Sequence, residues 1–266
     1  APPASGGNKK KLIIIIASIV GALVVIGVAI AIVFALFVPT KKDYEAASTQ
    51  FDSIKSEAQA LSSLGPDIEY SFLGSYDSFN EHERSAKASI TKIREESKKL
   101  SELKAMRYGE GADKYKAFDT KLQAYLTYLS NYLTSLSNSR GAIKTCSASS
   151  ADASSSTALK NFVDSCVSAL KSVGDIPNEP TKQLLSKLQT EFEKYSSLIS
   201  QLAAITDPYG KQYTQFLSIR DKIQTVDDNI VKIQDDYTAS VDKQVEELSL
   251  KDAVSNLTTL LQEKTR

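Results

Sequence analysis

"YKAFDTKLQAYLTYLSNYLTSL", residues 115–136, carries the clearest structural signal in this chain. Its large apolar side chains recur at alternating intervals of three and four residues. This apolar stripe consists of Tyr115, Phe118, Leu122, Tyr125, Leu129, Tyr132 and Leu136. A period near 3.5 residues places such side chains on one face of an α-helix. The stretch therefore predicts a long helix that buries one face against other helices.

The same spacing recurs in stretches that lie between clusters of Gly and Pro, the strongest helix breakers. The stretches are 44–61, 76–103, 159–173, 188–202 and 209–248, and the clusters are 65–74, 109–111, 174–180 and 208–210. Alternation typical of a strand is not sustained anywhere. Long helices joined by short loops favour antiparallel neighbours. We therefore predict an all-α fold, an elongated antiparallel bundle of about six helices over residues 41–266.

A shorter helix is expected at the end of the chain. Ser249 followed by Asp252 has the pattern of an N-cap with an acidic residue three positions later. The helix would continue through Leu257, Leu260 and Leu261. The loop at 107–115, RYGEGADKY, contains two glycines and lacks the spacing of a phosphate-binding loop, so we interpret it as a turn between helices.

The segment 12–38 predicts a membrane anchor. It contains no charged residue, and Ser18 is its one polar side chain. A helix of this length reaches roughly 40 Å, whereas the hydrocarbon core of a bilayer is about 30 Å thick. The apolar region of a cleaved signal peptide has only about 7–15 residues. We therefore predict an uncleaved, single-pass transmembrane helix at 12–38, preceded by a short disordered tail at 1–11.

The charges beside this segment predict its orientation. Lys9, Lys10 and Lys11 precede it, and Lys41 and Lys42 follow it together with acidic residues. The side with more Lys and Arg tends to stay in the cytoplasm. The N-terminal tail is thus expected in the cytoplasm and residues 41–266 outside it, in the extracellular or periplasmic space.

Small residues at Ala17 and Gly21 have the spacing that lets two membrane helices approach closely. This face is a candidate for self-association. The alternative is that Ala and Gly are simply common in membrane helices. The sequence alone leaves both interpretations open.

Cys146 and Cys166 are the two cysteines of the chain, and a Ser- and Ala-rich segment lies between them. An environment outside the cytoplasm favours a disulfide between them. Such a bond would join the end of one helix to the next and close the intervening loop. The alternative is that Cys166, which lies on an apolar stripe between Phe162 and Leu170, is a small core residue.

Composition and motifs argue against several classes of function. The chain has 32 basic and 32 acidic residues, and charges of both signs are interspersed, which does not favour nucleic-acid binding. His82 is the only histidine, and its neighbours Glu81 and Glu83 point to other sides of a helix. The acidic pairs at 227–228 and 235–236 lack the glycine turn of a calcium loop and are interpreted as a solvated face. We expect no enzyme, no metal site and no cofactor.

The chain has 12 tyrosines and no tryptophan. Tyr115, Tyr125, Tyr128 and Tyr132 are close enough on one helix to line a binding groove. Packing at the edge of a core is the alternative, because a tyrosine ring can be buried while its hydroxyl reaches polar surroundings.

These observations predict a single-pass membrane-anchored surface protein. Its helical ectodomain would act as a non-enzymatic binding or structural module in a stalk, in adhesion or in an envelope assembly. The alternative is a ligand-sensing helical bundle that signals through a partner protein. The expected partners are the lipid bilayer and either another protein or a second copy of the chain.

Overall fold

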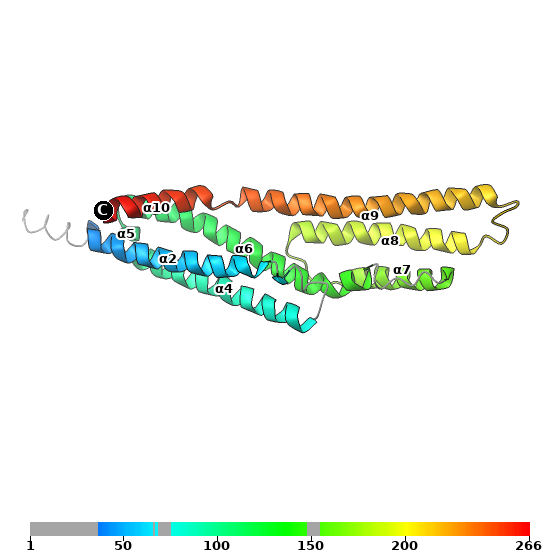
Figure 1. The fold of residues 1–266 in the computed structure, drawn as a ribbon, viewed down its shortest axis with the longest axis horizontal. Coiled ribbons are helices and arrows are strands. Elements are labelled where there is room, and N and C mark those ends of the chain that lie inside the picture. The colour runs from blue at the N-terminus through cyan, green and yellow to red at the C-terminus, as the bar shows by residue number, and fades with distance from the viewer. Residues whose placement is uncertain (1–36, 66, 69–75, 148–154) are drawn as a thin grey trace, which may run out of the picture. The chain divides into compact units, whose positions relative to one another are not determined.

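The computed structural model describes residues 37–65, 67–68, 76–147 and 155–266, which are largely α-helical (Figure 1). No strand occurs in these ranges. The helices are α2 (Lys41–Ser63), α4 (Tyr76–Glu102), α5 (Lys104–Arg107), α6 (Glu110–Thr145), α7 (Ser156–Lys171), α8 (Glu179–Ala203), α9 (Tyr213–Glu247) and α10 (Lys251–Thr265). The predicted all-α class is confirmed.

Helix boundaries follow local chemistry at the predicted breaks. Asn178 caps α8, because its side-chain oxygen accepts the backbone N–H of Thr181 at 3.1 Å, and Pro180 occupies the first turn. Gly109 has φ of 65°, a conformation that favours glycine, and it joins the short helix α5 to α6. The predicted turn is present, whereas α5 itself was not expected.

The predicted N-cap residue, Ser249, lies two positions before the first residue of α10. The helix begins at Lys251, whose backbone N–H donates to the Ser249 hydroxyl at 3.4 Å. The backbone N–H of Ser249 donates to the carbonyl oxygen of Glu246 at 3.0 Å, and the C-cap of α9 is Leu248.

The predicted membrane helix lies outside the described residues, except for Phe37 and Val38. So do the tail, Lys9, Lys10 and Lys11, and the face at Ala17 and Gly21. Lys41 and Lys42 are exposed at the start of α2. Among the residues that the structure describes, no helix has both the length and the apolar character needed to cross a membrane.

The chain divides into two compact units. The first unit comprises Ala1–Ser53, Glu96–Phe118 and Ala253–Arg266, and the second comprises Ile54–Glu95 and Asp119–Asp252. Helices α2, α4 and α6 each contribute residues to both units.

The first unit has a packed aromatic core. The rings of Phe51 and Phe118 meet edge to face, with their centroids 5.2 Å apart. The Tyr115 hydroxyl donates to the carbonyl oxygen of Ser97 at 2.8 Å, so this buried phenol is satisfied. Ion pairs join segments distant in sequence, as in Lys264 with Glu110 at 3.5 Å.

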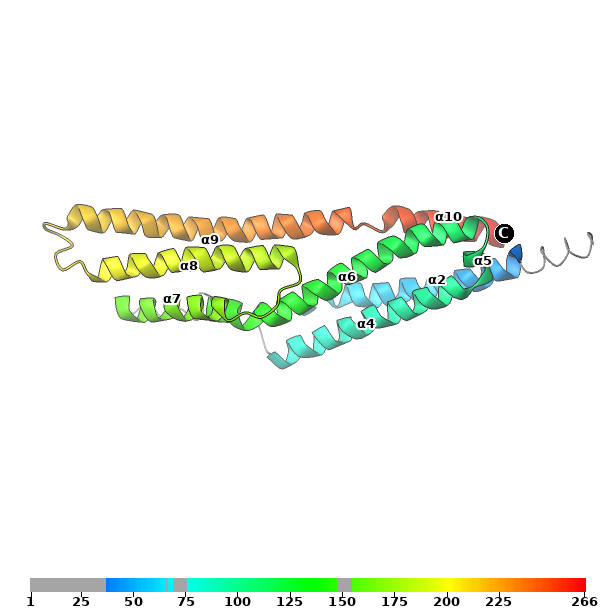
Figure 2. The ribbon, with the colours of Figure 1, turned by 180° about the vertical axis from the view of Figure 1, so that it is seen from behind.

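Within the second unit, α7, α8 and α9 lie side by side, and consecutive helices run antiparallel (Figures 1 and 2). Their core also includes the last turns of α6. The buried members are Ala142, Val163, Cys166, Leu170, Leu184, Leu185, Leu188 and Phe192. The predicted disulfide between Cys146 and Cys166 is present, with the two Cα atoms 4.8 Å apart, and it joins the end of α6 to α7.

The other part of the second unit is built from the end of α2, most of α4 and the middle of α6. Phe79 is fully buried, and the Arg140 guanidinium lies over its ring, 5.1 Å from the centroid. Lys92 of α4 forms an ion pair with Glu57 of α2. The Ser137 hydroxyl of α6 donates to the carboxylate of Glu83 on α4 at 3.1 Å.

Candidate ligand-binding cavity

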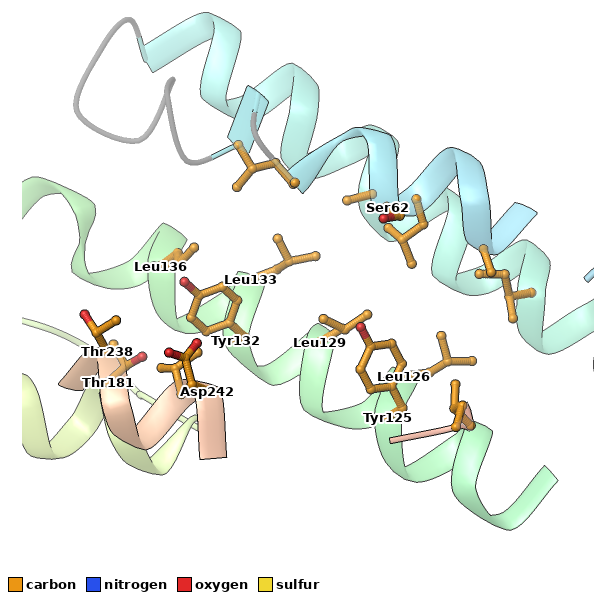
Figure 3. Close-up of a pocket in the computed structure, with 18 of the residues that line it drawn as sticks. Ser62, Tyr125, Leu126, Leu129, Tyr132, Leu133, Leu136, Thr181, Thr238 and Asp242 are labelled. Carbon is orange, nitrogen blue, oxygen red and sulfur yellow. The ribbon is translucent and has the colours of Figure 1, made fainter. Parts of the chain in front are cut away.

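The second unit contains a cavity of about 730 Å³ (Figure 3). Side chains from α2, α4, α6, α8 and α9 surround it, all of them within this unit. Its apolar wall consists of Ala58, Leu61, Ile68, Ala86, Ile93, Leu122, Leu126, Leu129, Leu133, Leu136, Ile143, Leu184, Val241 and Leu250. A volume of this size with mainly apolar walls is typical of small-molecule sites, which range over about 300–1,000 Å³.

Helix α6 supplies the longest continuous part of the wall. All five members of the apolar stripe from Leu122 onward line the cavity, whereas Tyr115 and Phe118 belong to the first unit. In Figure 3 the rings of Tyr125 and Tyr132 project from α6 toward the space between the helices. The periodicity that predicted a buried face thus also marks the residues of α6 that line the cavity.

A few polar groups interrupt the apolar wall. Thr181, Thr238 and Asp242 gather beside the ring of Tyr132, and Ser62 lies on the opposite wall (Figure 3). Thr238 and Asp242 are exposed on α9 and Ser62 is exposed on α2, so the cavity opens to solvent at its rim. Such convergent polar groups in an otherwise apolar cavity are the usual means of orienting a ligand.

Asp242 is the one ionisable carboxylate among the lining residues that the structure describes, and no Lys, Arg or His of those ranges lines the cavity. Lys243 follows Asp242 in the sequence, and its Nζ atom forms an ion pair with the Oε1 atom of Glu247 at 3.8 Å. Burial raises the pKa of the Tyr125 hydroxyl, so this phenol stays neutral at physiological pH. The described part of the lining therefore has one carboxyl group, and it lies at the rim.

A buried polar network holds α8 and its preceding loop against α6. The backbone N–H of Asn178 donates to the Ser135 hydroxyl at 2.9 Å, and the Thr181 hydroxyl donates to the Asn178 side chain at 2.8 Å. The hydroxyls of Thr181 and Tyr237 lie 3.4 Å apart. Because these groups are mutually satisfied, they position Thr181 and Tyr237 on the cavity wall.

Tyr128 lies beside this wall. Its ring stacks on that of Tyr132, with centroids 6.2 Å apart and an interplanar angle of 11°. Its hydroxyl is buried and lies near the Asn178 side chain. Burial raises the pKa of Tyr128, the nearby Asn178 side chain opposes this shift, and Tyr237 among other groups adds to it.

The structure separates the four tyrosines singled out in the sequence. Tyr125 and Tyr132 line the cavity, Tyr128 stacks on Tyr132, and Tyr115 is hydrogen-bonded in the first unit. Sequence reasoning missed Thr181, Thr238 and Asp242. Their approach to α6 depends on tertiary packing, and no local motif marks them.

The other candidate residues lie apart from the cavity. His82 is half-buried on α4, between the exposed Glu81 and the buried Glu83. Of the two acidic pairs, Asp228, Asp235 and Asp236 are exposed and Asp227 is half-buried. Within the described ranges, no three or more His, Cys, Asp or Glu residues come together as a metal site.

Comparison of the chain with protein-family models, with curated proteins and with solved structures finds no match. The geometry of the cavity is therefore the basis for a functional proposal.

Proposed function

We propose that this chain is a single-pass membrane protein whose helical region, residues 41–266, acts outside the cytoplasm as a non-enzymatic binding module. The charge-free segment 12–38 supports the anchor, and the lysines at 9–11 support a cytoplasmic N-terminus. The disulfide between Cys146 and Cys166 supports an oxidising location for the helical region.

The cavity in the second unit is the observation that carries the binding role. Helix packing normally fills the space between apolar stripes, because protein interiors are close-packed. Here five residues of one stripe line an opening of about 730 Å³. A small apolar molecule would bury these side chains, and the helical region would pass on its presence through a partner protein.

The anchoring is tested on the full chain in membrane vesicles. Carbonate washing should leave the protein in the membrane fraction, and protease added to the outer face should remove the helical region. Release of the intact chain by carbonate would contradict the membrane helix. Protection of the helical region in sealed, outward-facing vesicles would contradict the orientation.

The binding role is tested by thermal unfolding of the full chain in lipid nanodiscs with a panel of small apolar molecules. A ligand that binds only the folded state raises the unfolding midpoint. Ser62→Trp places a large ring in the cavity and should abolish the shift. Ser56→Trp, at an exposed position of α2 that does not line the cavity, is the matched control. Equal shifts in both variants would contradict a site in the cavity.

A second candidate role, adhesion or assembly through a protein partner, is favoured by the turn between α8 and α9. Tyr209 is 89% exposed there. The turn is held by Gln212, whose side-chain oxygen accepts the backbone N–H of Thr206 at 2.9 Å and of Asp207 at 3.0 Å. An ordered turn that presents an exposed tyrosine resembles an interface anchor. If this role holds, Tyr209→Ser removes the crosslinks between the chain and its partner. Tyr213 is also exposed, and Tyr213→Ser should remove fewer of these crosslinks.

A further inference from the structure

We propose that the cavity selects a small hydrophobic molecule that carries one positive charge, such as an aromatic or alkyl amine. This inference rests on the proposed binding role and adds the chemical class of the ligand. The ligand's apolar body would lie along α6, and its charged end would lie at the rim beside Asp242 (Figure 3).

The charged residues of the described lining favour a cationic ligand. Asp242 is the single carboxylate in the described lining, and no basic side chain from those ranges accompanies it. A cation at the rim is attracted to this carboxylate, whereas a ligand carboxylate at the same place is repelled. A neutral ligand experiences neither effect. The electrostatic preference of the cavity is therefore for a cation.

The tyrosine rings of the lining also favour a cation. Tyr125, Tyr132 and Tyr237 line the cavity, and their faces are the negative part of the ring quadrupole. Tyr132 and Asp242 line the same side of the cavity in the view of Figure 3, so a cation bound there would have both a carboxylate and an aromatic ring among the lining groups. Aromatic rings around a cation are a common recognition mode for amines and quaternary ammonium groups.

The apolar wall favours a ligand with a hydrocarbon body. Five leucines of α6 are part of the apolar wall beyond the polar rim. A strongly hydrated inorganic cation would lose its hydration there without replacement ligands, since a carboxylate and a few hydroxyls are too few. The charge must therefore belong to an amphipathic molecule.

The test uses three probes with one apolar body and different end groups: 4-phenylbutylamine, 4-phenylbutan-1-ol and 4-phenylbutyrate. Each is titrated into the full chain in phosphatidylcholine nanodiscs at pH 7 and followed by calorimetry. Titration into empty nanodiscs gives the lipid background, which is subtracted. We expect the amine to bind at least about tenfold more tightly than the carboxylate, with the alcohol between them.

Asp242→Asn removes the rim charge and keeps the shape of the side chain. It should weaken amine binding by about three- to tenfold and leave the alcohol unchanged. Asp236→Asn, on the same helix at an exposed position outside the cavity, is the control and should change neither. Circular dichroism of each variant establishes that the fold is retained, and both positions are exposed, so loss of folding is not expected.

The outcomes separate the two proposals. Equal affinity of the amine, the alcohol and the carboxylate would overturn the inference about charge and leave the binding role intact. The same would follow if Asp242→Asn bound the amine as well as the unaltered chain. Absence of binding by all three probes would overturn the binding role itself, and the inference with it.

Discussion

One apolar stripe on α6 passes through both units, and it meets a different environment in each. In the first unit, Phe118 packs against Phe51 and the Tyr115 hydroxyl is paired with Ser97. In the second unit, Tyr125 and Tyr132 line an open cavity. The spacing of the side chains is the same in both, so the difference comes from the surrounding helices. Periodicity therefore defines an apolar face without defining what covers it.

The largest expected effect compares packed and cavity-lining leucines. Leu100 is fully buried in the first unit, and Leu129 is half-buried on the cavity wall of the second. Leu100→Ala should lower the free energy of unfolding by about 2–5 kcal/mol, because it creates a void. Leu129→Ala only enlarges an existing cavity and should cost about 1 kcal/mol. Guanidinium unfolding followed by circular dichroism measures both, and equal losses would contradict the difference between the units.

The disulfide is specific to the second unit. Cys146→Ala combined with Cys166→Ala should lower the free energy of unfolding by about 3 kcal/mol, because the open chain gains entropy when it unfolds. Hydrogen exchange should show the loss in α7 and the end of α6. Protection in α10, which belongs mostly to the first unit, should stay unchanged. Uniform loss over both units would show that they unfold together.

Two glycines of α6 extend the comparison between the units. Substitution by alanine should lower the stability of the protein at one of them and raise it at the other. A Cβ on Gly111 would lie 1.8 Å from the carbonyl oxygen of Ala105, whereas a Cβ on Gly141 would meet no atom within 4 Å. Gly111→Ala should destabilise the first unit by about 1–3 kcal/mol. Gly141→Ala should stabilise α6 by about 0.5–1 kcal/mol. Thermal unfolding decides the signs, and a stabilising Gly111→Ala would refute the close contact with α5.

The smallest expected effect depends on pH and involves two aspartates of the second unit. The hydrogen bond from Lys160, followed by that from Ser196, lowers the pKa of Asp164. Its contribution to stability is present above the ordinary aspartate pKa and is lost as pH falls through the lowered value. Burial, followed by the neighbouring Asp228, raises the pKa of Asp227. Its contribution is present below the ordinary pKa and is lost as pH rises through the raised value.

At neutral pH, Asp164→Asn should therefore lower the unfolding midpoint and Asp227→Asn should raise it. Both differences should shrink toward pH 3. Thermal unfolding between pH 3 and pH 7 tests this, with the exposed Asp235→Asn as a control. A midpoint that moves in the same direction for both variants would contradict the assigned environments.

Most of the fold could be predicted from local signals. The stripes marked the helices, and the Gly and Pro clusters at 109–111 and 174–180 marked their ends, because helix breaking acts over a few residues. The helix α5 was missed because four residues are too few to show a period. The predicted cap residue Ser249 lies close to the start of α10, and its hydroxyl accepts the backbone N–H of Lys251.

The cavity could be predicted only in part. Tyr125 and Tyr132 were visible as stripe residues, and the sequence left open whether they pack or bind. Asp242 lies on another helix, about a hundred residues further along the chain, and no sequence spacing relates it to α6. Its place at the rim depends on how α9 packs in the second unit, which is a long-range property.

Photoaffinity labelling tests the central claim most directly, because it locates a bound amine on the chain. A diazirine derivative of 4-phenylbutylamine is irradiated with the full chain in nanodiscs, with and without excess unlabelled amine, and the labelled peptides are sequenced. The account predicts label on residues 122–136 of α6 and 237–242 of α9 that the unlabelled amine displaces. Label that is displaced only from other segments, or label on α6 and α9 that no competitor reduces, would contradict a ligand site in the cavity.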